Sequence, residues 1–193
     1  MSKGEIRESG INIVGDINWG THFCQLYYTK EELMEVLIPY FRAGLENNEF
    51  CVLITLNSVA IEKALRGAIS DLDVYLQKGQ LEIIPYNDWY LKEGFFEPRA
   101  VLNNWAEKLD MVSKEDYEGL RFSEDIFSFG EYRDDFVVYE KEMDRITRNH
   151  PIIALCTYSL KGYSATEIIG IIASHQFALF KEGTKLAQIK KFD

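Results

Sequence analysis

Two side chains suited to metal binding or nucleophilic chemistry, His22 and Cys24, lie two positions apart in the apolar segment 20–28. Side chains alternate between faces in an extended strand, so His22, Cys24 and Leu26 share one face of the expected strand. A structural metal site needs two further ligands, for which the candidates are Cys156, His150 and His175. The pair therefore raises two chemical hypotheses, metal binding and thiol catalysis.

The spacing of His22 and Cys24 favours neither hypothesis. A reactive thiolate needs a cationic neighbour or a helix N-terminus, and nucleophilic sites usually contain a third, orienting group. No such group is evident near the pair in the sequence. A buried cysteine mostly behaves as a small apolar residue. We therefore expect Cys24 to be a core residue and His22 a hydrogen-bonded strand residue, with no metal, no cofactor and no catalytic residue.

The segment 21–27 leads into Thr29-Lys30-Glu31-Glu32, a Ser/Thr-x-x-Glu capping box that opens a helix over 30–47. In P-loop proteins this corner carries GxxxxGK[ST], whose backbone N–H groups and lysine hold phosphates. Here it reads Tyr27-Tyr28-Thr29-Lys30, and the chain contains no Gly-Lys dipeptide. The sequence therefore argues against nucleoside triphosphate hydrolysis and predicts a protein that is not an enzyme.

Unbroken apolar segments alternate with amphipathic helical patterns. Strands are expected at 21–27, 51–56, 81–85, 119–123, 152–158 and 175–180. Helices are expected at 30–47, 59–69 and 71–78, from Pro98 onward, and at 131–149. Pro39 should kink or end the first helix early. This alternation predicts an α/β fold, a three-layer αβα sandwich with a mostly parallel, doubly wound sheet.

The domain expected is a single one over 1–193, with a core at about 10–180 and peripheral segments at 1–9 and 184–193. Residues 1–19 should form a loop with a short extended piece at 11–14, and 87–96 an irregular, aromatic stretch.

The net charge of −10 argues against direct binding to nucleic acid, which requires clustered Lys and Arg. Residues 1–10 lack the apolar region of a signal peptide, and the longest aliphatic cluster, 168–173, is too short to cross a bilayer. The cysteines Cys24, Cys51 and Cys156 all lie in apolar segments, which suggests reduced thiols. Together these features predict a cytoplasmic protein with no contact to membranes.

Polar and aromatic side chains follow the expected strands. Because parallel strands end at a common edge, these residues should gather there. They are Tyr27, Tyr28, Asn57, Tyr86, Asn87, Glu124, Asp125, Tyr158 and Ser159. The set suits a small, partly apolar ligand better than a polyphosphate. Glu140, if it points inward from its helix, should pair with Arg121, because buried charges are nearly always paired.

The motifs in combination resemble the MEDS domain, the methanogen/methylotroph, DcmR sensory domain. The resemblance rests on Gly20-Thr21-His22-Phe23-Cys24 with Tyr27, PYFRAGLENNEFCVLIT at 39–55, Tyr139-Glu140, LCTY at 155–158 and His175, and it covers roughly 10–180. It implies a RecA/KaiC-like fold that has lost its nucleotide loop, and a module that senses small organic compounds such as hydrocarbon or halocarbon derivatives.

By position, the resemblance places the residues of the family's motifs at His22, Cys24, Tyr27, Cys156, Tyr158 and His175. The family usually has proline after the last histidine, whereas this chain has Gln176. The resemblance also implies a histidine kinase or transcription-regulator partner, in cis or in trans, as in two-component systems.

The sequence thus predicts a non-enzymatic, ligand-binding sensory domain for a small organic molecule. The expected ligand-binding residues are His22, Cys24, Tyr27, Tyr28, Arg121, Glu124, Glu140, Cys156, Tyr158 and His175. Two alternatives stay open: a metal-binding or thiol enzyme based on His22 and Cys24, and a protein-interaction module with a vestigial nucleotide pocket. The sequence also leaves open whether the chain is monomeric or a homodimer, and whether it is a stand-alone sensor or part of a longer protein.

Overall fold

The computed structural model describes residues 6–92, 94–126 and 132–190. Its elements, in chain order, are β1 (Ile6–Glu8), β2 (Asp16–Asn18), β3 (Thr21–Tyr27), α1 (Lys30–Glu46), β4 (Phe50–Thr55), α2 (Ser58–Ala68), α3 (Leu72–Gln77), β5 (Leu81–Pro85), α4 (Tyr86–Tyr90), α5 (Pro98–Lys114), β6 (Leu120–Ile126), α6 (Arg133–Asn149), β7 (Ile152–Ser159), a 3₁₀ turn η2 (Leu160–Gly162), α7 (Ala165–Ser174), β8 (Phe177–Glu182) and β9 (Lys185–Lys190).

The main sheet has the strand order β5-β4-β6-β7-β3-β8-β9. Every neighbouring pair in it is parallel except β8 and β9, which form an antiparallel hairpin. Strands β3, β4 and β6 are buried along their whole length, as expected for apolar strands covered on both faces. Strand β3, the first strand of this sheet in chain order, lies in its interior between β7 and β8. Its two faces therefore contact the two helical layers that cover the sheet.

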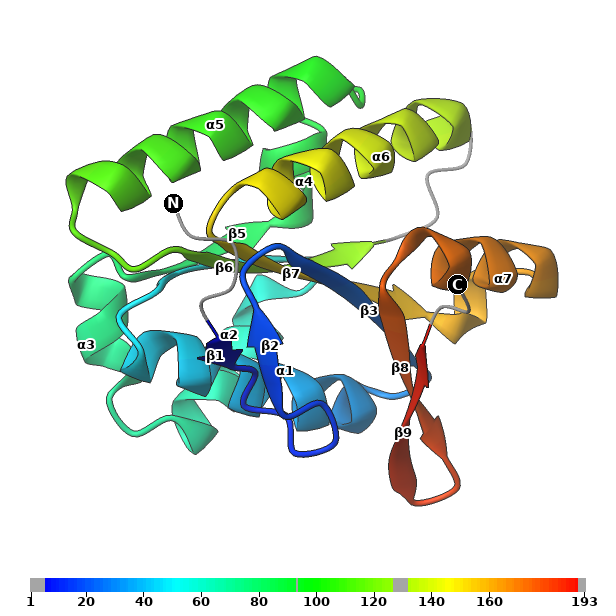
Figure 1. Cartoon of the computed structure of the whole chain (residues 1–193), viewed down its shortest axis with the longest axis horizontal. Helices are drawn as coiled ribbons and strands as arrows, with labels where there is room; N and C mark the ends of the chain where they lie inside the picture. Colours follow the sequence, from blue (N-terminus) through cyan, green and yellow to red (C-terminus); the bar gives the residue numbers. More distant parts are fainter. Residues whose placement is uncertain (1–5, 93, 127–131, 191–193) are drawn as a thin grey trace.

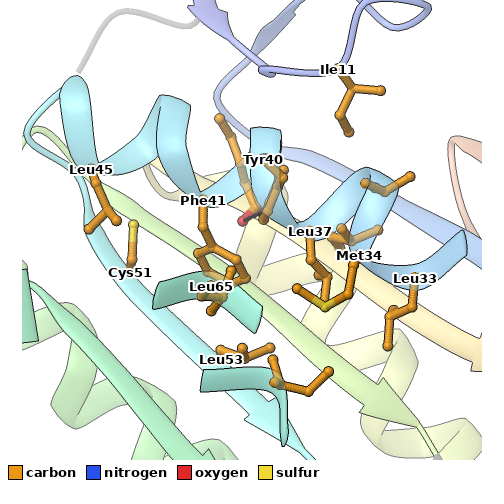
Figure 2. Packing of buried hydrophobic residues seen from close by; sticks show 14 of the residues in the cluster. Ile11, Leu33, Met34, Leu37, Tyr40, Phe41, Leu45, Cys51, Leu53 and Leu65 are labelled. Carbon is orange, nitrogen blue, oxygen red and sulfur yellow. Dashed lines mark hydrogen bonds between the residues drawn. The ribbon is translucent and has the colours of Figure 1, made fainter. Parts of the chain in front are cut away.

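Helices cover both faces of this sheet (Figure 1). One face packs against α1, α2 and α3, in a core that includes Phe23, Leu53 and Leu65. Figure 2 shows Leu37 and Phe41 of α1 packed within this core. The other face packs against α4, α5, α6 and α7, in a second core that contains Cys24, Trp105, Tyr139 and Cys156. The prediction of a three-layer, mostly parallel αβα fold is therefore confirmed.

Helix α1 runs without a break through Pro39 to Glu46, so the early end expected at the proline does not occur. Proline removes one backbone hydrogen bond. Packing outweighs that loss, because Val36, Leu37, Tyr40 and Phe41 are all almost completely buried. The predicted cap at Thr29 is present, since its hydroxyl accepts the Glu32 N–H. The Glu32 carboxylate bonds to the N–H of Tyr28 rather than to that of Thr29.

Several boundaries predicted at the ends of the chain are wrong. Segment 1–19 contains the antiparallel pair β1 and β2, and 11–14 is a turn rather than an extended piece. The last parallel strand begins at Phe177, after His175. Segment 185–190 forms β9, the edge strand of the main sheet. These short strands have weak sequence patterns, and whether they form depends on pairing with a neighbouring strand. Residues 1–5 and 191–193 lie outside the described residues.

Two internal predictions are also wrong. The aromatic stretch after Pro85 contains the short helix α4. Strand β6 extends through Ile126, so Glu124 and Asp125 lie inside it and not beyond its end. Hydrogen-bonding partners on neighbouring strands and helices allow these two carboxyl groups to be buried. Residue 131, the expected start of the helix before Pro151, lies outside the described residues. Within the part of the chain described, no helix combines the length and apolarity needed to cross a bilayer.

Two helical glycines should respond in opposite directions to alanine. A Cβ at Gly44 in α1 would lie 2.6 Å from Arg121 Cδ and 2.9 Å from Cys51 Sγ, whereas a Cβ at Gly67 in α2 would meet open space. We expect Gly44→Ala to destabilise the protein by about 1–3 kcal/mol through overpacking. Gly67→Ala should stabilise it by about 0.5–1 kcal/mol. Urea unfolding measures both, and equal effects would contradict the packing at Gly44.

Candidate functional site

Four buried side chains from distant parts of the chain converge between the sheet and helices α6 and α7. They are His22 on β3, Glu140 on α6, Cys156 on β7 and His175, which caps the C-terminus of α7. One potential ligand atom from each lies within 4.8 Å of the others. Strands β3 and β7 pair in parallel with Cys24 beside Cys156, so His22 is offset from Cys156 by two residues on the same face.

Hydrogen bonds orient both histidine rings of this cluster. The Nδ1 atom of His22 lies 3.3 Å from Asp144 Oδ1, and that of His175 lies 2.7 Å from the Ile171 carbonyl oxygen. Both partners are acceptors, so each Nδ1 carries the proton and each Nε2 has a lone pair, which on His22 can accept the Cys156 thiol S–H. Nε2 of His22 is 3.3 Å from Cys156 Sγ. Both Nε2 atoms therefore face the centre of the cluster.

Two buried atoms at the centre have no hydrogen-bond partner, Glu140 Oε2 and His175 Nε2. Each Nε2 atom, on His22 and on His175, is 3.9 Å from Glu140 Oε2, too far for a hydrogen bond. His175 and His22 are each only 1% exposed. Buried polar atoms are rarely left without a partner, because each such atom loses its hydration without compensation.

Burial perturbs the ionisable groups of the cluster. Burial and the nearby Glu124 raise the pKa of Glu140 to about 8. Burial raises the pKa of the Cys156 thiol well above its usual value, and Glu140 adds to this effect. Burial and the neighbouring His22 lower the pKa of His175 to about 3. At neutral pH, then, Glu140, Cys156 and His175 favour their uncharged forms when nothing is bound.

Asp144 behaves differently, because it has two partners. Burial alone would raise the pKa of Asp144, but hydrogen bonds from His22 and Arg148 hold it at about 2. Arg148 Nε lies 2.7 Å from Asp144 Oδ2. Asp144 is thus a fixed carboxylate behind the His22 ring.

A groove with a volume of about 680 Å³ lies beside the cluster, between α6 and α7. The buried side chain of Tyr158, near the end of β7, contributes to its wall. The lining residues are Phe136, Val137, Glu140, Lys141, Asp144, Tyr158, Tyr163, Thr166, Glu167, Gly170, Ile171, Ala173 and Ser174. The Tyr158 hydroxyl donates to Glu140 Oε1 at 3.4 Å. Glu140 therefore belongs to both the groove and the cluster.

The structure brings together five of the ten predicted ligand-binding residues: His22, Glu140, Cys156, Tyr158 and His175. They lie on the face of the sheet, under α6 and α7, and not at the β3–α1 corner. Cys24 is buried on the same face but is not one of the four converging ligands. His150, a metal-ligand candidate in the sequence, is exposed at the end of α6, where its Nδ1 bonds to the Ile146 carbonyl.

The two tyrosines of the β3–α1 corner lie elsewhere. Tyr27 is on the opposite face of the sheet, where its hydroxyl donates to Asp125 Oδ1 at 2.7 Å. Burial and that carboxylate raise the pKa of Tyr27. The side chain of Tyr28 is largely exposed, at 55%. Neither tyrosine lines the groove between α6 and α7.

Glu124 is buried in β6 within a separate network of aromatic donors. Its Oε1 accepts the Tyr139 hydroxyl at 2.6 Å and the Trp105 indole N–H at 3.1 Å. Burial raises the pKa of Glu124 to about 7, although the hydrogen bonds oppose the shift. Glu124 acts on Glu140 through charge and does not line the groove.

The predicted pairing of Arg121 with Glu140 is wrong. Arg121 pairs instead with Glu49, through Nε to Oε2 at 2.5 Å and Nη2 to Oε1 at 3.2 Å. Alternation along β6 directs Arg121 toward α1, whose Tyr40 carbonyl it also contacts, on the face opposite α6. Arg121 therefore belongs to the core under α1 and not to the groove.

Sequence reasoning missed Asp144 and most of the lining of the groove. The spacing of Phe136, Glu140 and Asp144, each four residues apart, places them on one face of α6. That pattern was a usable signal, but it also fits a solvated helix face, which is the commoner arrangement for charged residues. The lining from α7 was missed too, because the mostly apolar pattern of this helix did not single out the residues that face the groove.

The fold is that of RecA/KaiC-like αβα proteins. A KaiC-like protein, PH0186, from Pyrococcus horikoshii OT3 superposes with a TM-score of 0.59 at 16% identity, over 95% of this chain and 85% of that one. The flagellar accessory protein FlaH from Methanocaldococcus jannaschii gives a TM-score of 0.54 at 14% identity, over 93% and 82%. At these identities the likeness concerns the fold alone.

The chain belongs to the MEDS family, the methanogen/methylotroph, DcmR sensory domain, which matches residues 21–176. It is also 28% identical over 174 residues to the transcriptional repressor DcmR of Methylorubrum extorquens (strain DSM 6343 / CIP 106787 / DM4). That alignment covers 83% of this chain, and the chain spans 60% of the repressor's length. Family and relative together support a sensory or regulatory role, and the resemblance predicted from the motifs is confirmed.

Proposed function

We propose that this chain is a non-enzymatic sensory domain that binds a small, largely apolar organic molecule in the groove between α6 and α7. The observation that carries the proposal is the groove itself, which has the volume of a small-molecule site, about 680 Å³. It lies next to buried polar groups of the cluster, so an occupant would contact both an apolar surface and a few fixed polar atoms.

The lining residues favour this class of ligand. Aromatic and aliphatic side chains, among them Phe136, Tyr163 and Ile171, provide most of the apolar contact surface. The Tyr158 hydroxyl and the Glu140 carboxyl are the polar groups nearest the buried end. Small organic sites commonly combine an apolar lining with a few placed polar groups. A halogenated or oxygenated hydrocarbon fits this chemistry better than a charged nucleotide.

The lack of a nucleotide loop in the sequence, and the raised pKa values of the three buried cysteines, support a binding role over catalysis. The β3–α1 corner carries tyrosines where a phosphate loop would need glycines and a lysine. The pKa of the Cys24 thiol is raised by burial and by Glu140, which is the reverse of what a nucleophilic cysteine requires. The signal produced by ligand binding to this domain would pass to a transcription-regulator or histidine kinase module, in cis or in trans.

Helix α7 is the element best suited to carry a signal. None of its ten residues is buried, although six of them are isoleucine or alanine. An element with so little buried surface can shift at small cost. A ligand that contacts Thr166, Gly170 and Ile171 would bind one position of α7 more tightly than another, and that difference is what a population shift requires.

Filling the groove should weaken ligand binding without unfolding the protein. A side chain added at Gly170 meets open space in the groove, so Gly170→Phe should occupy the ligand's volume and weaken binding at least about tenfold. The matched control is Ile169→Phe on the same helix, at a side chain that is 67% exposed. Thermal-shift and calorimetric screening against small halogenated and oxygenated hydrocarbons measures both. Binding that survives Gly170→Phe, or no binding by the wild-type protein, would refute the proposal.

A further inference from the structure

We propose that His22, Glu140, Cys156 and His175 form a binding site for a divalent cation of the zinc class. This inference goes beyond the sensory role and does not depend on it. It also departs from the expectation, drawn from the sequence, that the chain holds no metal. The sequence pointed to His22 and Cys24 as the pair to consider, whereas the structure assembles a different set around His22.

The first argument is the pair of orphaned atoms at the centre of the cluster. Glu140 Oε2 and His175 Nε2 are both buried and both without a hydrogen-bond partner, and they face each other at 3.9 Å. With Nδ1 of His175 donating to Ile171, Nε2 of His175 presents a lone pair toward Glu140 Oε2, and Oε2 does the same toward Nε2 once Glu140 releases its proton, as metal binding requires. Two facing acceptors repel each other unless a cation or a proton lies between them.

The second argument is the set of groups behind the two histidines. The carboxylate of Asp144 accepts from Nδ1 of His22, and a backbone carbonyl accepts from Nδ1 of His175. Metal-bound histidines almost always have such an acceptor on the nitrogen that does not bind the metal, because it fixes the tautomer and the ring orientation. Arg148 in turn holds Asp144 in place. Both rings are therefore prepared to coordinate through Nε2.

The third argument is the spacing of the ligand atoms. A tetrahedral zinc ion with bonds of about 2.0–2.3 Å keeps its ligand atoms about 3.3–3.8 Å apart. The separations observed are 3.3 Å for His22 Nε2 to Cys156 Sγ, and 3.9 Å from each histidine Nε2 to Glu140 Oε2. All four atoms lie within 4.8 Å of one another. Each ligand atom therefore needs to move by less than about 1 Å toward the centre of the cluster to coordinate an ion of this size.

The chemistry of the donors selects the class of metal. Two imidazoles, one thiolate and one carboxylate suit Zn²⁺ or its spectroscopic substitute Co²⁺, and they do not suit Mg²⁺ or Ca²⁺, which prefer oxygen ligands. The thiolate of Cys156 and the carboxylate of Glu140 together carry two negative charges, which balance the charge of the ion. A neutral unit is what a site this deeply buried requires.

The test uses the full chain, stripped with a chelator and then titrated with Zn²⁺ or Co²⁺. We expect one equivalent of tightly bound metal by elemental analysis, and a thiolate-to-cobalt charge-transfer band with Co²⁺. Cys156→Ser should abolish that band and weaken Zn²⁺ binding by at least about 100-fold. Cys24→Ser, a matched change of a buried cysteine on the adjacent strand, should leave both unchanged.

A second variant keeps the metal site testable if the Cys156→Ser protein fails to fold. Asp144 lies behind His22 and is only half-buried, so Asp144→Asn should keep the fold and weaken Zn²⁺ binding about 10–100-fold. Gly170→Phe, which fills the groove, should bind metal like the wild type, so that loss of ligand sensing and loss of metal are separable. Substoichiometric Zn²⁺, Co²⁺ bound without a thiolate band, or a band lost in Cys24→Ser and kept in Cys156→Ser would each overturn the site.

Discussion

Replacing Glu49 by alanine should destabilise the protein by about 3–5 kcal/mol, the typical effect of leaving one partner of a buried ion pair without the other. Glu49 and Arg121 are both completely buried. In the variant, the Arg121 guanidinium keeps its contacts to the backbone carbonyls of Glu8, Ser9 and Tyr40 but loses its only described carboxylate partner. Urea unfolding followed by circular dichroism measures the change.

A double-mutant cycle separates the ion pair from the loss of a side chain. If the pair itself matters, the Glu49→Ala/Arg121→Met protein should be less destabilised than the sum of the two single changes, because no unpaired charge remains. Glu49 also accepts from Arg7 at 3.1 Å, so Arg7→Ala is needed beside the cycle. The control is Arg66→Ala, which removes exposed pairs with Glu62 and Asp73 and should change stability by less than about 1 kcal/mol. Strict additivity would contradict the assignment.

Arg121 also shows what the sequence could and could not predict. Local pattern placed β3, α1, β4 and the start of α5 within a residue or two, because apolar runs and caps are properties of neighbouring residues. The partner of Arg121 was predicted wrongly, since Glu49 and Glu140 are equally plausible until the face of β6 is known. That face depends on which strands flank β6, and strand order is not encoded locally.

The candidate site follows the same logic. His22, Cys156, Tyr158 and His175 were selected by residue type and by the resemblance to the family, and all of them lie at the groove or the cluster. Glu140 was predicted as well, but the sequence did not show that α6 also brings Asp144 over the sheet, where it contacts His22. A helix with many charged residues shows where its apolar stripe lies but not which charges turn inward.

Glu124→Gln should stabilise the protein increasingly as the pH rises. Burial raises the pKa of Glu124 to about 7, above its value in the unfolded chain, so the folded state holds its proton more tightly. A group of this kind contributes stability that is present at low pH and is lost as the pH rises from about 4.3 through about 7. Glutamine has no proton to lose. The stability of the variant relative to wild type should therefore rise by about 3 kcal/mol between about pH 4 and about pH 8.

The size of this pH-dependent stability difference depends on the groups that face Glu124. Tyr90, Trp105 and Tyr139 donate to it, which favours the charged form, and the pKa of about 7 is the balance between these donors and burial. Glu140 acts in the same direction as the substitution, because its own raised pKa falls when the charge at position 124 is removed.

Unfolding should be measured with a chelator present, so that metal at Glu140 does not contribute. Glu107→Gln, at an exposed position on α5, is the control and should give a difference independent of pH. A flat difference for Glu124→Gln would mean that its three donors hold the carboxylate charged in the folded protein, and that the network is a stable anion site rather than a buried neutral acid.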